Sequence, residues 1–90
     1  MDHLLSMRVF IKVAELRGFA RAANAVGISS TVATRYVADL ESRLGTRLLN
    51  RTTRSVSVTE SGQAYLERVR QVLGELVRLH GLLGHAALLM

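Results

Sequence analysis

Small hydroxyl side chains and one arginine gather between residues 29 and 35. Ser29 is a good helix-capping residue, and four further polar residues follow it: Ser30, Thr31, Thr34 and Arg35. Hydroxyl groups donate and accept hydrogen bonds in little space, and arginine makes paired hydrogen bonds to the edge of guanine. At the start of a helix, such side chains suit the major groove of duplex DNA. We predict that these four residues read bases and that Ser29 contacts a phosphate. The alternative is a helical hairpin with an ordinary polar face.

A second cluster combines arginine with threonine and consists of Arg51, Thr52, Thr53 and Arg54. The chain has a net charge of +5, and no acidic residue occurs between Ser42 and Thr59, so the excess charge is concentrated around this cluster. Arginine and threonine at the tip of a turn suit a phosphate backbone or a minor groove. We predict phosphate contacts from these four residues. An exposed turn with ordinary surface arginines is the alternative.

The composition argues against an enzyme and against a metal protein. The 90 residues contain no cysteine, and His80 and His85 are five residues apart, so they do not share a helix face and have no carboxylate close in sequence. The glycines match neither phosphate-binding pattern, and no nucleophile is paired with a base. Arg8 and Lys12 interrupt the first apolar stretch, so neither a leader nor a membrane span is indicated. We expect a soluble cytoplasmic protein without catalytic residues, cofactor, metal or small-molecule ligand.

Hydrophobic spacing predicts three short helices that would position the first polar cluster. Apolar residues recur at helical intervals over residues 4–16 and 19–26. A third helix follows Ser29, with one apolar face made of Ala33, Val37, Leu40 and Leu44. Gly27 and Gly45 are suited to end the second and third helices. Two short helices that meet at a glycine turn are the core of a helix-turn-helix.

After the third helix the pattern changes to that of a hairpin. Residues 48–51 and 55–58 are rich in strand-forming side chains on either side of a polar tip, and Thr59 then caps a long helix. The predicted fold class is mainly α. It is a winged helix-turn-helix of three helices and a two-stranded β wing over residues 1–58, followed by a long linker and dimerisation helix over residues 59–90.

The long helix carries apolar residues at alternating intervals of three and four. The spacing includes Leu66, Val69, Leu73, Leu76, His80 and Leu83, with Ala87 beyond them. Such a seam pairs helices of two chains, and a polar residue on it sets the register of the pairing. We predict a homodimer through this seam, whose direction of pairing stays open. An interaction module that pairs through the same helix with a longer regulator, without binding DNA, is the alternative.

Together these segments resemble the N-terminal domain of LysR-type transcriptional regulators. The resemblance rests on Met7-Arg8-Val9-Phe10, Ala22-Ala23, Gly27-Ile28-Ser29, Leu40-Glu41, Arg43-Leu44-Gly45, the run from Arg47 to Arg54, and Thr59-Glu60-Ser61-Gly62. It implies a dimeric winged helix-turn-helix that binds a partly palindromic DNA operator and regulates transcription. It also implies linker helices that pair antiparallel. The family's effector-sensing domain is absent from these residues.

The sequence departs from this family in two ways that bear on DNA binding. Gly18 stands where the family usually has serine or threonine, so the cap of the second helix is weaker, and we expect Arg17 to compensate with a phosphate contact. The third helix opens with Ser30-Thr31-Val32-Ala33, which differs from the family's usual residues. Base preference is therefore the property that transfers least from the family.

Overall fold

Three helices form the N-terminal part of the chain in a computed structural model that describes residues 3–51 and 55–89. Helix α1 spans His3–Leu16, α2 spans Phe19–Val26 and α3 spans Ser30–Leu44. The described backbone then forms strands β1 (Leu49–Arg51) and β2 (Val56–Val58) and the long helix α4 (Glu60–Leu89). Side chains of His80 and of residues 82–89 lie outside the description. The predicted mainly α fold class is confirmed, and α1 begins one residue earlier than expected.

One apolar core holds the three helices and the wing together. Phe10 from α1, Ala22 from α2 and Leu40 from α3 are fully buried, and Leu48 and Leu49 are at most 1% exposed. The small side chains of Ala22 and Ala23 let α3 approach α2 closely, which is what a helix-turn-helix requires. Phe10 also packs against Tyr65 of α4, with ring centroids 5.7 Å apart. Burial raises the pKa of the Tyr65 hydroxyl above its usual value.

The turns follow the local signals in the sequence. Gly27 and Gly45 adopt left-handed backbone with φ of 88° and 68°, and each N–H closes the preceding helix on a carbonyl four residues back. Gly18, by contrast, caps α2 without a side-chain hydrogen bond. The left-handed residue at that corner is Arg17, with φ of 55°, which is a costly conformation for a residue with a Cβ.

The wing is an antiparallel hairpin whose register pairs Leu49 with Val58, Asn50 with Ser57 and Arg51 with Val56. Thr59 then joins the wing to α4. Its hydroxyl donates to the carbonyl of Arg47 (2.7 Å) and accepts the N–H of Gly62 (2.9 Å), as expected for an N-cap. Gly62 packs against Leu48 so closely that a Cβ would overlap the Leu48 carbonyl oxygen. The start of α4 is therefore locked to the body of the molecule.

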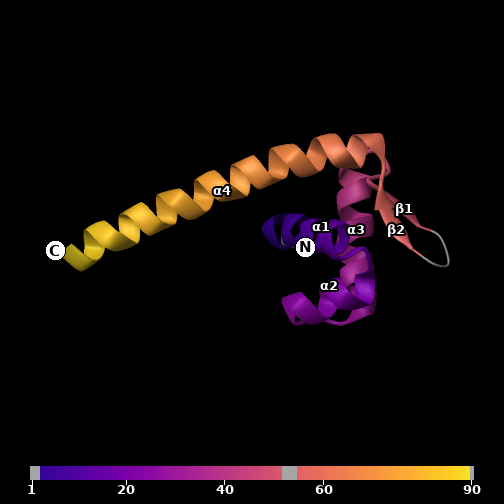
Figure 1. Cartoon of the computed structure of the whole chain (residues 1–90), viewed down its shortest axis with the longest axis horizontal. Coiled ribbons are helices and arrows are strands. Elements are labelled where there is room, and N and C mark those ends of the chain that lie inside the picture. Colours follow the sequence, from indigo (N-terminus) through magenta and orange to yellow (C-terminus); the bar gives the residue numbers. More distant parts are fainter. Residues whose placement is uncertain (1–2, 52–54, 90) are drawn as a thin grey trace.

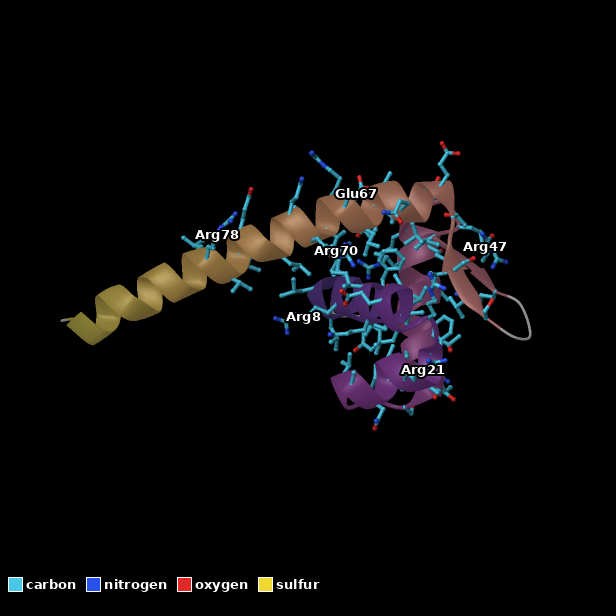
Figure 2. All side chains as sticks on the ribbon, in the orientation of Figure 1. Arg8, Arg21, Arg47, Glu67, Arg70 and Arg78 are labelled. Atoms are coloured by element: carbon cyan, nitrogen blue, oxygen red, sulfur yellow. The ribbon has the colours of Figure 1, made fainter. Side chains whose placement is uncertain are left out.

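Helix α4 runs from the wing past α1 and far beyond the rest of the molecule (Figure 1), so that the chain measures 53 × 25 × 22 Å. Its first turns pack on the body, where Leu66 and Val69 are each only 4% exposed. Arg70 reaches from α4 towards α1 (Figure 2) and its Nη2 lies 3.2 Å from Oε2 of Glu15. Within the described residues, no helix is long and apolar enough to cross a membrane.

Three apolar residues differ from the expectation. The sequence pattern places Leu44 on the buried face of the third helix, but it is 41% exposed because it is the last residue of α3 and lies beyond the edge of the core. The same kind of pattern places Leu66 and Val69 on the dimer seam, but they are buried within a single chain, Leu66 as a member of its core. The large described apolar residues of α4 that are mostly exposed therefore begin at Val72.

Candidate nucleic-acid interface

The turn between α2 and α3 presents the first polar cluster to solvent. The N–H groups of Gly27 and Ile28 both bond to the Ala23 carbonyl, at 2.8 and 3.0 Å, which closes α2 in a tight turn. Ser29 caps α3 by accepting the N–H of Val32 at 3.1 Å. The first N–H groups of a helix and its dipole favour negative charge. The Ser29 proton remains available, so the predicted phosphate contact is chemically compatible with its capping role.

The four residues predicted to read bases share the N-terminal half of α3. Ser30, Thr31 and Arg35 are exposed, while Thr34 is partly buried. The Thr34 hydroxyl donates to the Ser30 carbonyl at 2.9 Å, so it keeps only its acceptor capacity for a base. Val32, between them, is also partly buried. The structure thus brings the four residues together on one helix, with Thr31 and Arg35 opposite the face that Ala33, Val37 and Leu40 bury, and with Ser30 and Thr34 at its flank.

Arg35 is the exposed cation of this group. No described acidic residue forms an ion pair with it, so its guanidinium keeps its donors available for a partner outside the chain. A guanidinium one turn into such a helix has the reach and the fork geometry to donate two hydrogen bonds to guanine. Arg17 is likewise exposed, at the corner between α1 and α2.

The arginines near the wing are not equivalent, although no acidic residue separates them in sequence. Arg43 pairs with Asp39 at 2.9 Å on α3. Arg51 pairs with Glu41 at 3.0 Å and lies over the ring of Phe19, 5.1 Å from its centroid. Arg51 is predicted to contact a phosphate, but its guanidinium already has partners within the protein. Thr52, Thr53 and Arg54, the rest of the predicted wing contacts, lie outside the described residues.

Two further exposed arginines join this side of the molecule and were not among the predicted contacts. Arg21 lies in the first turn of α2, and Arg47 lies between α3 and β1 (Figure 2). Arg47 lines a surface pocket together with Ser42 and Thr46. The acid-free segment of the sequence already pointed to Arg47. Arg21 had no such signal, because its position depends on how α2 packs.

The apolar surface of α4 extends beyond the predicted seam. Leu73 and Leu76 are partly buried, and the side chains of His80 and Leu83 lie outside the description. Val72, Val77 and Leu79 are 56%, 62% and 51% exposed and were not part of the prediction. The seam residues and these three cover a broad face of α4 rather than a narrow stripe.

Known proteins are similar to this chain in sequence and in fold. A family model described as bacterial regulatory helix-turn-helix protein, lysR family, matches residues 4–63. The uncharacterized HTH-type transcriptional regulator YhjC of Escherichia coli (strain K12) is 45% identical over 82 residues, which are 91% of this chain and 27% of that protein. An HTH-type transcriptional repressor of Pseudomonas aeruginosa (strain UCBPP-PA14) is 42% identical over 83 residues, 92% of this chain and 26% of that protein. The chain thus spans about a quarter of the length of these two relatives.

Among solved structures, BenM_DBD in complex with catB site 1 DNA superposes with a TM-score of 0.90 at 28% identity. The match covers 97% of this chain and 96% of that one, so α4 is included in the likeness. The family model covers the three helices, the wing and the start of α4, which are the elements that present the polar cluster. The chain belongs to the lysR family of bacterial regulatory helix-turn-helix proteins.

Proposed function

We propose that this chain binds duplex DNA sequence-specifically, as part of a transcriptional regulator. The observation that carries the proposal is the exposed start of α3, where Ser30, Thr31 and Arg35 stand free of the core on a rigid helix. The likeness to BenM_DBD, which was crystallised with DNA, supports it. In this assignment α3 enters the major groove, and no residue of the chain has a catalytic role. A regulator that acts on chromosomal DNA works in the bacterial cytoplasm.

The proposed DNA contacts fall into two classes, contacts to bases and contacts to phosphates or the minor groove. Ser30, Thr31, Thr34 and Arg35 face base edges, with Thr34 as an acceptor for an adenine or cytosine amino group. Ser29 at the N-terminus of α3, Arg17 at the α1–α2 corner and the tip residues Thr52, Thr53 and Arg54 contact phosphates or the minor groove. Phosphate contacts supply affinity without sequence information, whereas the α3 contacts supply the discrimination.

The chain binds as a homodimer through the outer part of α4. A single module reads one short half-site, whereas two modules on one side of the duplex read half-sites about one or two helical turns apart. The operator is therefore a partly palindromic sequence. The exposed Val72, Val77 and Leu79, next to Leu73 and Leu76, supply the apolar surface for pairing.

The test is Arg35→Ala, assayed on an operator that is first selected from a random duplex pool by the wild-type chain. The variant should lose roughly 1–3 kcal/mol of binding free energy on the selected duplex and much less on random duplexes, because it removes a base contact. Arg78→Ala is the matched control, since Arg78 is an exposed arginine on α4 that lies far from α3 (Figure 2). If binding is insensitive to salt, or if no duplex is enriched, the proposed function is wrong.

A further inference from the structure

Glu41, near the end of α3, holds the beginning of the wing. Its Oε2 accepts the backbone N–H groups of Leu48 and Leu49 at 2.8 and 3.2 Å, and its Oε1 lies 3.0 Å from Nη2 of Arg51. The Glu41 side chain is only 11% exposed. One carboxylate on α3, the helix proposed to enter the major groove, therefore binds three groups of the segment that leads into and forms β1.

Arg51 makes the matching contact from the wing. Its guanidinium lies between the carboxylate of Glu41 on α3 and the ring of Phe19, the first residue of α2. The side chain is 31% exposed, so solvent screens the ion pair only in part. Arg51, the last residue of β1, thus links the wing to both helices of the helix-turn-helix.

We propose that Glu41 and Arg51 are positioning residues, which set the wing relative to the recognition helix, and that Arg51 is not a phosphate ligand. The inference rests on the DNA binding proposed above. A phosphate bound to Arg51 would lie beside the carboxylate of Glu41, and like charges at that distance repel. Moving Arg51 away instead would leave a mostly buried carboxylate without its counter-charge. Residues 52–54 follow Arg51 directly, so their reach to DNA depends on where β1 is held.

The two roles of Arg51 predict opposite responses to neutralising Glu41. If Arg51 binds phosphate, Glu41→Gln removes a competing negative charge and strengthens binding to every duplex. If the pair positions the wing, Glu41→Gln releases Arg51 and weakens binding to the selected operator. We expect a loss of about tenfold, a size that coupled contact pairs commonly reach. The introduced amide still has an oxygen to accept a backbone N–H, so the substitution acts mainly on the ion pair.

The matched control is Asp39→Asn, which makes the same change in net charge on the same helix. Asp39 pairs with the exposed Arg43, and among the described contacts it has none with the wing. We expect Asp39→Asn to leave operator binding unchanged or slightly stronger, in contrast to Glu41→Gln. Equal strengthening by both variants would overturn the inference, because it would show that only charge matters at Glu41.

Arg51→Lys and Arg51→Ala complete the test and cover the case in which Glu41→Gln folds poorly. Lysine keeps the positive charge for a phosphate but lacks the planar fork that pairs with Glu41 and stacks on Phe19. We expect both variants to bind the operator more weakly, with the dependence of binding on salt unchanged. A lysine variant that binds like wild type, together with a salt slope lowered by about one in the alanine variant, would identify a phosphate ligand. If the wild-type chain itself binds no duplex, the failure lies with the proposed function instead.

Discussion

In the body of the molecule, side chains from α1, α2, α3, the wing and the first turns of α4 enclose one another, and Phe10, Val37 and Leu40 have no exposed surface. The outer part of α4, from residue 71 onward, instead leaves more than half of Val72, Val77 and Leu79 in solvent. The body is stabilised by its own core. An isolated helix of this kind is marginal in water, because helix stability in proteins comes mostly from packing of an apolar face.

This difference assigns separate tasks to the two regions. The body fixes the geometry of α3 and the wing, so its contacts determine which side chains the proposed DNA interface presents. No described residue of the outer part of α4 belongs to that core, and its apolar face matches the pairing proposed above. The joint between them is made by Thr59 and Gly62, which hold the start of α4 against the segment 47–48. In the proposed dimer, the angle of that joint would set the distance between the two α3 helices.

The largest effect is expected from Leu73→Asp combined with Leu76→Asp. Two charges on the outer part of α4 should abolish pairing, since each leucine is worth roughly 1.5–3 kcal/mol when it is buried. Sedimentation should then show monomers, far-UV circular dichroism should show a helical body, and tight binding to a palindromic operator should be lost. Gln63→Asp with Gln71→Asp is the control, because both glutamines are exposed on the same helix. A wild-type chain that is monomeric at tens of micromolar and still binds a palindrome tightly would contradict the pairing role assigned to the outer part of α4.

A smaller effect is expected from alanine in the body, measured against alanine on the outer part of α4. Leu40→Ala should lower the free energy of unfolding by about 2–5 kcal/mol, because it leaves a cavity in the core. Leu79→Ala should change it by about 0.5 kcal/mol or less in the monomer, since Leu79 is mostly exposed there. Urea unfolding at low protein concentration, monitored by circular dichroism, measures the change in unfolding free energy for both variants. Equal losses for the two variants would mean that the outer part of α4 belongs to the same packed core.

The smallest effect tests the joint between the regions. Thr59→Ala should cost about 1 kcal/mol of unfolding free energy as an N-cap. We expect it to exceed the cost of Ser29→Ala, because Thr59 also donates to the Arg47 carbonyl whereas Ser29 shows only the capping bond among its described contacts. Thr59→Ser keeps the hydroxyl and should restore most of the stability. If alanine at the two positions costs the same, the bond to Arg47 contributes nothing to the joint.

Local signals in the sequence were sufficient for the elements and for placing the hydroxyl-rich cluster at the start of α3. Gly27, Ser29 and Gly45 act on the backbone within one helical turn of themselves, and so does the capping bond of Thr59, so these effects do not depend on the rest of the fold. The hydroxyl-rich start of α3 follows from the same cap, because the cap fixes which residues form the first turn. The resemblance to the LysR family, which the family model confirms, rests on these same local patterns.

Only the tertiary structure decided which long side chains are available to a partner. In sequence Arg51 belongs to an acid-free segment, but in space it lies between Glu41 and Phe19. Leu66 and Val69 have the same spacing as Leu73 and Leu76, yet they are buried because α4 crosses the body at its start and leaves it afterwards. Helical spacing determines the face of a helix that a residue occupies. What that face meets depends on the path of the helix through space, and for an arginine on the position of the nearest carboxylate.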